Sequence, residues 1–309
     1  MISSLDPSSE KFLIDLTRLQ ALSERAQRQI SSGLKISEAA DAPDQIGALL
    51  QLQADLGHNT QIKSNLVRVK AEVDTAEQTV GQAIQLTDRL VVLATQGANG
   101  TQTADTRLAL AQEVKGLQEQ LVSLTGTTVE GRFVFGGDAD QSAPYRLNTS
   151  STATTNGVDR LTKSAATRQV EDPNGQTFQV AKTAQDIFDA RNADDTFAPQ
   201  NLFVAVNSLR VALETNDIVG IQAAIPAIQK AADYVNSQQS FYGVAQNRIT
   251  AASELADRTE TSLRIQISAG RDADVAEAAL QLSSTRTQLE AALSARAKLP
   301  RTSLFDFLG

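Results

Sequence analysis

Apolar residues recur every three or four positions through the first hundred residues, on both sides of a break at Ser31-Ser32-Gly33. This spacing predicts helices that bury one face against another helix. A glycine after the last apolar position supplies the left-handed residue that closes a helix. The longest uninterrupted series runs from Ile62 to Ala94, and a similar series returns near the carboxyl end. The chain therefore begins and ends with long helices that need partners.

Helical periodicity covers most of the chain. A Ser/Thr residue before the first apolar position, as at Thr103, is typical of a helix cap. Pro226 lies early in a long helix and is interpreted as marking its start instead of a kink. The predicted helices span residues 12–30, 44–96, 103–125, 200–213, 217–267 and 272–299.

Residues 34–44 form a compact connector between the first two helices. In it, Asp41 and Pro43 are interpreted as a helix cap followed by a first-turn proline.

The character of the chain changes again after Gly126. Residues 132–135 read as a strand, and the turn sequence 172–175 precedes a second alternating stretch at 176–180. The middle of the chain is therefore predicted to be a small β-rich insert.

These elements predict a mainly α fold. Both chain ends form a long antiparallel helical bundle or coiled coil, and a small β-rich domain is inserted in the middle. The predicted segments are an amino-terminal assembly helix with its connector (1–43), the first part of a helical rod (44–129), the insert (130–199), the second part of the rod (200–270), and a carboxy-terminal assembly helix with a tail (271–309).

Composition narrows the class of protein. Aromatic residues make up only 4% of the 309 residues, which suits slender helices better than one thick core. The net charge is −8 and no block of Lys or Arg stands out, so an extended nucleic-acid face is not expected. The absence of Cys excludes disulfides and thiolate chemistry. No run of 18 apolar residues predicts a membrane span, and the first residues lack the features of a cleavable signal.

No residue pattern points to catalysis or to a bound cofactor. His58 is the only histidine, and a lone imidazole on a helix is most often a surface or partly buried polar residue. Asp272, Asp274 and Glu277 fit a charged first helical turn better than a metal site. The glycines at 131–137 lack the Lys-Ser/Thr end of a phosphate loop. We therefore expect a protein that is not an enzyme, with no metal and no cofactor.

Short motifs carry a resemblance to a known family. The stretch from Ile30 to Ile36, followed by Asp41-Ala42-Pro43-Asp44, resembles the amino-terminal signature of the flagellin family, which includes the filament subunit and the hook-associated proteins. Residues 96–101, 131–137 and 303–308 match further family motifs in the same order. The strand at 131–137 and the tail look most like the members that join the hook to the filament.

The resemblance implies a structural role outside the cell, in the bacterial flagellum. It implies export through the flagellar type III apparatus without a cleaved signal. It also implies that the terminal helices of neighbouring copies pair into an inner coiled-coil tube, with the insert pointing outward. The implied partners are other copies of the chain, a neighbouring hook-associated protein, flagellin and an export chaperone, with no nucleic acid and no membrane.

Two groups of residues are candidates for this role. The interpretation of the apolar terminal positions as subunit contacts competes with burial inside the chain's own bundle, and the tail competes with a frayed end. The connector residues would form a hinge. The candidate contact residues are Phe12, Leu16, Leu19, Ala26, Ile30, Leu282, Leu289, Leu293, Leu304, Phe305, Phe307 and Leu308, and the candidate hinge residues are Ser31, Ser32, Gly33, Asp41 and Pro43.

Three alternatives to a junction protein stay open at this point. The first is a flagellin proper, the subunit of the filament. The second is an intracellular coiled-coil adaptor, for which the absence of a signal would be natural. The weakest is an enzyme within residues 138–199, because that stretch offers neither His nor Cys.

Overall fold

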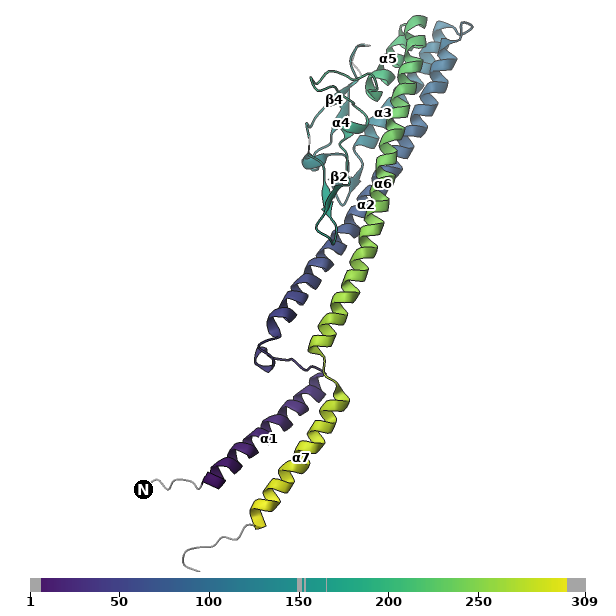
Figure 1. The fold of residues 1–309 in the computed structure, drawn as a ribbon. Coiled ribbons are helices and arrows are strands. Elements are labelled where there is room, and N and C mark those ends of the chain that lie inside the picture. Colours follow the sequence, from purple (N-terminus) through teal and green to yellow (C-terminus); the bar gives the residue numbers. More distant parts are fainter. Residues whose placement is uncertain (1–6, 149–151, 153, 165, 299–309) are drawn as a thin grey trace, which may run out of the picture. The chain divides into compact units, whose positions relative to one another are not determined.

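The computed structural model describes residues 7–148, 152, 154–164 and 166–298 (Figure 1). The chain divides into two compact units, and each unit draws on both halves of the chain. Met1–His58 and Glu260–Gly309 form what we call the terminal unit, and Asn59–Thr259 form the central unit. The predicted fold class, mainly α with small sheets in the middle, is confirmed.

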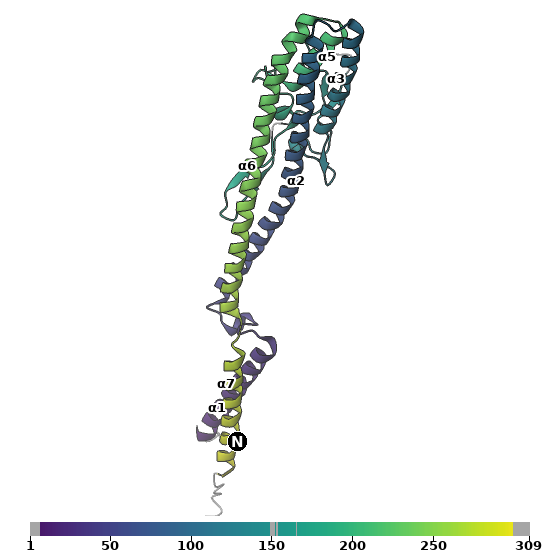
Figure 2. The same cartoon turned by 90° about the vertical axis from the view of Figure 1, so that its right-hand side faces the viewer.

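The central unit is a bundle of long antiparallel helices. The helices α2 (Ile46–Ala98) and α6 (Ile218–Arg271) lie side by side, and α3 (Ala104–Thr125) and α5 (Leu202–Glu214) pack beside them (Figure 2). Every position of the predicted series from Ile62 to Ala94 is buried, including Thr87. This series is therefore the core of the chain's own bundle.

Capping residues explain where the shorter helices begin. The Thr103 hydroxyl accepts a hydrogen bond from the Thr106 amide at the start of α3, and the Asn201 side chain accepts one from the Val204 amide at the start of α5. The interpretation of Pro226 as a helix start is wrong, because α6 begins at Ile218 and contains this proline. Burial of the apolar face on both sides of it offsets the lost backbone hydrogen bond.

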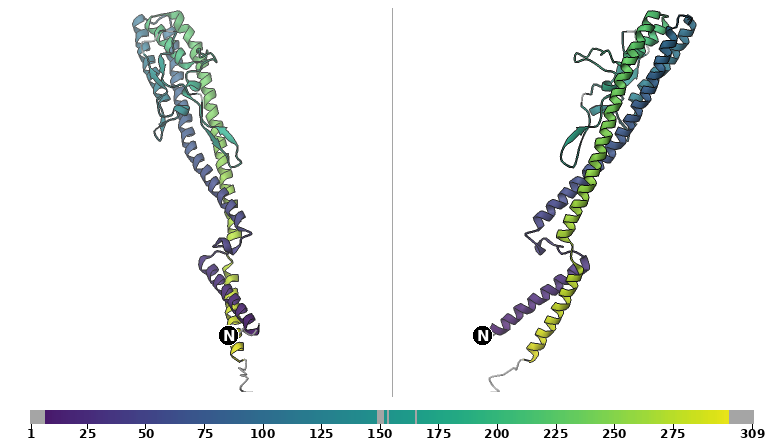
Figure 3. Two further views of the ribbon diagram at one scale, coloured as in Figure 1. Left: turned by 90° about the vertical axis from the view of Figure 1, so that its left-hand side faces the viewer. Right: turned by 45° about the vertical axis from the view of Figure 1, so that its right-hand side comes forward.

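The described residues in the middle of the chain form three separate two-stranded antiparallel sheets against the helices of the central unit (Figure 3). The loop between the first two strands contains Glu130 and Gly131, both with positive φ, as two-residue hairpin loops require. The strands pair as β1 (Thr128–Val129) with β2 (Arg132–Phe133), β3 (Tyr145–Leu147) with β4 (Val158–Arg160), and β5 (Gln169–Glu171) with β6 (Thr177–Gln179).

The predicted turn at Asp172–Gly175 is confirmed: the Gly175 amide donates to the Asp172 carbonyl, and β6 follows. The predicted strand at 132–135 is only partly right, since β2 ends at Phe133. Phe135 is buried instead, with its ring 5.8 Å from that of Phe188 in an edge-on arrangement. Packing among aromatic rings, not strand pairing, holds this part of the chain on the helices.

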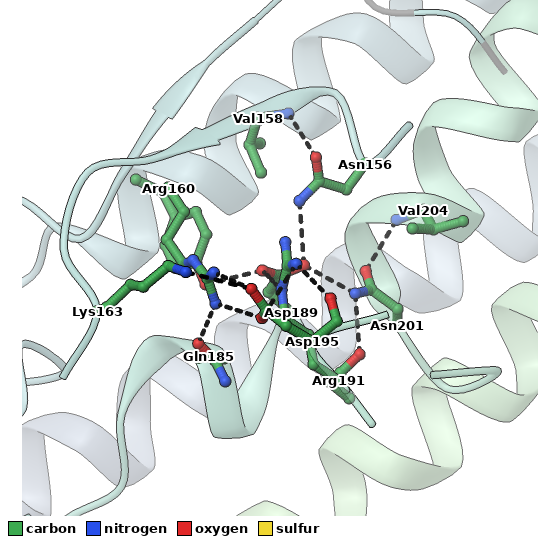
Figure 4. A network of polar contacts seen from close by, with 12 residues as sticks. Asn156, Val158, Arg160, Lys163, Gln185, Asp189, Arg191, Asp195, Asn201 and Val204 are labelled. Carbon is green, nitrogen blue, oxygen red and sulfur yellow. Dashed lines mark hydrogen bonds and ion pairs between the residues drawn. The ribbon is translucent and has the colours of Figure 1, made fainter. Parts of the chain in front are cut away.

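A buried carboxylate joins the segments around these sheets. Asp189 is fully buried just after the short helix α4 (Ala184–Ile187), and both of its oxygens accept hydrogen bonds (Figure 4). Its donors are the Tyr145 hydroxyl at 3.0 Å, the Asn156 amide at 3.0 Å, the Asn201 amide at 2.8 Å and Arg191 Nε at 2.8 Å.

The terminal unit contains α1 (Pro7–Ser32), a short 3₁₀ turn (Ala39–Asp41), the first turns of α2, the last turns of α6, and α7 (Val275–Lys298). The last break lies slightly later than predicted, because α6 continues through Gly270 to Arg271. Among the described helices, none is long and apolar enough to cross a membrane.

Candidate functional site: the paired terminal helices and their joint

The helices α1 and α7 pair antiparallel within the terminal unit (Figure 1). At one end of the pair, the Arg296 guanidinium lies 5.6 Å from the centre of the Phe12 ring. At the other end, the Ala273 amide donates to the Gly33 carbonyl at 2.9 Å. The two chain ends therefore meet along most of both helices.

The predicted face of α1 is the face turned toward α7. Ala26 is buried, and its small side chain allows close approach of the two helices. The larger side chains of this face are only half-buried, which leaves apolar surface open on the pair. These half-buried positions are Phe12, Leu16, Leu19 and Ile30.

The predicted contact residues of α7 differ in their burial within the chain. Leu282 and Leu289 are half-buried, and Leu293 is 49% exposed. The buried positions are Ala278 and Thr285, which complete the four-three spacing with the two leucines. These small residues were missed because the sequence reading followed the large apolar side chains.

Several large apolar side chains on the pair are not covered by other described residues. Leu280 is 73% exposed and Ile14 is 62% exposed, and Leu13, Val275 and Leu293 are each about half exposed. Isolated exposed apolar residues are common on proteins, but a two-helix pair with apolar side chains open on both helices is a surface suited to further helix packing.

The predicted break after α1 is confirmed. Gly33 has φ +70°, and its amide closes the helix on the Gln29 carbonyl at 2.9 Å. The hydroxyls of Ser31 and Ser32 both donate to the Arg28 carbonyl one turn earlier, and the Ser32 hydroxyl accepts a hydrogen bond from the Leu34 amide. The serines therefore connect the last helical turn to the residue that follows Gly33.

The sequence predicted that Asp41 caps the following helix, and this prediction is wrong. The Asp41 carboxylate accepts hydrogen bonds from the amides of Ser37 and Glu38, so it closes the turn of the connector itself. These two amides hold the pKa of the Asp41 carboxyl below its usual value. Pro43 likewise lies before the helix, since α2 begins only at Ile46.

The connector also supplies the centre of a small core. Ile36 is 4% exposed and packs with Leu49 of α2 and Ile267 of α6. This contact fixes the connector on the first turns of one long helix and the last turns of the other. This small core contains no residue of α1 or α7.

The remaining candidate residues, Leu304, Phe305, Phe307 and Leu308, lie outside the described part of the chain. Within that part, His, Asp and Glu side chains nowhere gather in a group of three that could hold a metal ion.

Family comparison agrees with this arrangement. The family model for the bacterial flagellin N-terminal helical region matches residues 8–140, and the model for the bacterial flagellin C-terminal helical region matches residues 225–308. The two regions together include more than two thirds of the chain. They contain α1, α2, α3, α7 and most of α6.

Individual relatives are distant. Flagellar hook-associated protein 3 of Salmonella typhimurium is 26% identical over 216 residues, which are 67% of this chain and 64% of the relative. This chain thus matches less than two thirds of that relative's length. Flagellin of Bacillus subtilis is 22% identical over 271 residues, which are 85% of this chain and 84% of the relative.

The fold also agrees with a solved structure, that of flagellar hook associated protein-3 from Legionella pneumophila. The TM-score is 0.59 at 13% identity, covering 70% of this chain and 97% of that one. At this identity the likeness concerns the fold alone. With the N-terminal and C-terminal helical regions of bacterial flagellin both matched, in order and over more than two thirds of its residues, the chain belongs to the flagellin family.

Proposed function

We propose that this protein is a structural component of the bacterial flagellum that joins the hook-associated zone to the filament. The observation that carries the proposal is the match of two thirds of the chain to a flagellar hook-associated protein 3. The protein works by helix packing between subunits and performs no catalysis. It acts outside the cell, on the flagellum, after export without a cleaved signal peptide.

The paired helices α1 and α7 are the surfaces for assembly. Their half-buried faces and the open side chains of Ile14, Leu280 and Leu293 would be covered by helices of neighbouring subunits. The partners are other copies of the chain, a neighbouring hook-associated protein and flagellin, with an export chaperone binding before assembly. Leu304, Phe305, Phe307 and Leu308 belong to the same contacts, and residues 31–33, 41 and 43 to the hinge.

A strain that lacks the gene tests this proposal. Loss of a junction protein should leave filament subunits unassembled, so flagellin should appear in the medium while hooks stay intact. Antibody against this protein should label one band at the base of sheared filaments.

A filament subunit is the second candidate, because the flagellin of Bacillus subtilis matches a larger share of this chain. In that case, the deletion strain would keep hooks and junction proteins but release no other flagellin. The antibody would then label whole filaments, and the junction proposal would be abandoned.

Replacing Leu293 with glutamate tests the assembly surface. Because this side chain is half exposed on α7, we expect the free energy of unfolding of the free protein to change by no more than about 0.5 kcal/mol. A carboxylate buried between apolar helices is costly, so incorporation into flagella should fall by about tenfold or more. Quantitative blotting of sheared flagella against cell extract measures it.

The matched control is Leu293→Met, which keeps an apolar side chain of similar volume and should incorporate normally. Normal incorporation of Leu293→Glu would show that this face of α7 stays open to water in the flagellum.

A further inference from the structure

Two helix breaks that lie more than 200 residues apart in the sequence meet in the terminal unit. One is the end of α1 at Ser32, and the other is the end of α6 at Arg271. Between them, Leu34 and Asp272 form an isolated antiparallel bridge. The chain therefore continues after each break with a residue that pairs with the residue after the other break.

Three backbone hydrogen bonds hold the breaks together. The amides of Lys35 and Ile36 donate to the Arg271 carbonyl at 2.7 and 3.2 Å, and the Ala273 amide donates to the Gly33 carbonyl at 2.9 Å. The last four carbonyls of a helix receive no hydrogen bond from amides of the helix itself. Here the carbonyl that ends α6 is satisfied by the segment that follows α1, so neither break is complete without the other.

Each helix around the bridge is otherwise closed locally. The Asp274 carboxylate accepts hydrogen bonds from the amides of Ala276 and Glu277 and so caps α7 independently. On the side of α6, the Ser268 hydroxyl donates to the Asp272 carboxylate. An ideal Cβ on Gly33 would meet no atom within 4 Å, so the bend there is not locked by packing.

We infer that the two breaks work as one joint, at which α1 and α7 change direction together relative to the last turns of α6. The bridge connects the segment after α1 to the segment after α6 at the bend, and the contact face between α1 and α7 connects the two helices beyond it. The Ile36 core holds the connector on the other side. This inference concerns the chain itself and does not depend on which flagellar part the protein forms.

Distances between spin labels test the coupling. The chain has no native cysteine, so single cysteines can be placed at the exposed positions Gln20 on α1, Ile265 on α6 and Arg286 on α7. Pulsed dipolar spectroscopy on the full chain should give a narrow distance distribution for the pair 20–286. The pairs 20–265 and 265–286 should both be broader. A distribution for 20–286 as broad as that for 265–286 would show that the helices move separately.

Replacing Ala273 with proline removes the amide that donates to Gly33. We expect the 20–286 distance distribution to broaden by about twofold, because one of the three backbone hydrogen bonds between the two breaks is lost. The matched control is Val275→Pro: Val275 is the first residue of α7, a position where proline is favoured and where the amide has no acceptor within the helix. An unchanged distribution in Ala273→Pro would overturn the single joint.

Amide exchange in the unaltered chain keeps the test decisive if the proline variant does not fold. Because the bridge opens as one unit, the amides of Lys35, Ile36 and Ala273 should show protection factors within about threefold of one another. Protection of Ala273 that differs by more than about tenfold from that of the other two would mean that the breaks open independently.

Discussion

Replacing Asp189 with alanine is expected to destabilise the protein by about 3–5 kcal/mol, because four buried or partly buried donors, one of them a cation, lose their common acceptor. The side chain is fully buried and accepts hydrogen bonds from Tyr145, Asn156, Arg191 and Asn201. Of these, Arg191 is a cation with a side chain only 12% exposed. Its remaining ion pair would be the longer contact with the partly exposed Asp195 carboxylate, at 3.4 Å.

The same carboxylate connects three segments that are far apart in the sequence, at Tyr145, Asn156 and Asn201. Burial, followed by the nearby negative charge of Asp189, raises the pKa of the Tyr145 hydroxyl, so this hydroxyl stays a donor at all physiological pH values. Asn201 is also the cap of α5. Loss of Asp189 should therefore loosen β3, the segment at Asn156 and the start of α5 together.

Denaturant unfolding followed by circular dichroism measures the change in the free energy of unfolding. The matched control is Asp159→Ala, which removes a partly exposed carboxylate paired with the exposed Arg146 and should cost no more than about 1 kcal/mol. Asp189→Asn keeps the shape but loses the charge opposite Arg191, and should fall between the two. Equal effects for Asp189→Ala and Asp159→Ala would contradict the assigned role.

The sequence predicted the helices of the central unit because each carries its signal locally. The spacing from Ile62 to Ala94 is repeated over many turns, and the cap at Thr103 lies directly before its helix. Such patterns need no knowledge of the partner. Pro226 was misread for the opposite reason: whether a helix continues through proline depends on packing with other helices, which the local sequence does not contain.

The insert was predictable in one turn and in the two short strands β2 and β6, but not in how its segments pack together. The hairpin turn at Asp172–Gly175 has its own chemistry and was found, whereas the network around Asp189 joins residues from 145 to 201. No periodic pattern links these positions. The three short sheets are likewise set by what they pack against, and not by strong alternation within the strands.

The joint was half visible in the sequence. Gly33 marks one break through its backbone freedom, and the predicted helix boundaries at 267 and 272 place the other break close to Arg271. That the two breaks meet carries no motif, because the contact uses backbone carbonyls and amides that every residue has. Two buried positions of α7 were not predicted, for a related reason. Ala278 and Thr285 are small, so they give a weak apolar signal even though they are buried.

Replacing Arg107 with alanine is expected to destabilise the protein by about 2–4 kcal/mol, since the buried Gly97 carbonyl and two partly buried acceptors lose their common donor and the packed arginine side chain is removed. This arginine on α3 is 3% exposed and has no carboxylate partner among the described residues. Instead its guanidinium donates to the carbonyls of Gly97 and Asn99 and to the side chain of Asn216 at 2.9, 3.0 and 2.7 Å.

These acceptors explain how a buried cation is tolerated. The carbonyls of Gly97 and Asn99 lie at the carboxyl end of α2, where the helix dipole favours positive charge and the last carbonyls lack helical donors. Asn216 belongs to the turn between α5 and α6 and has φ 54°, an uncommon value for a residue other than glycine. One side chain therefore fastens both loops at this end of the central unit.

The matched control is Arg89→Ala, which removes an arginine of the same unit whose side chain is 50% exposed and pairs with Glu113 at the surface. It should cost no more than about 1 kcal/mol in denaturant unfolding. Arg107→Lys separates charge from geometry: a lysine keeps the positive charge but cannot reach three acceptors in the planar arrangement of a guanidinium, so most of the loss should remain. Full rescue by lysine would mean that the charge at the end of α2, and not the fastening of both loops, is what Arg107 contributes.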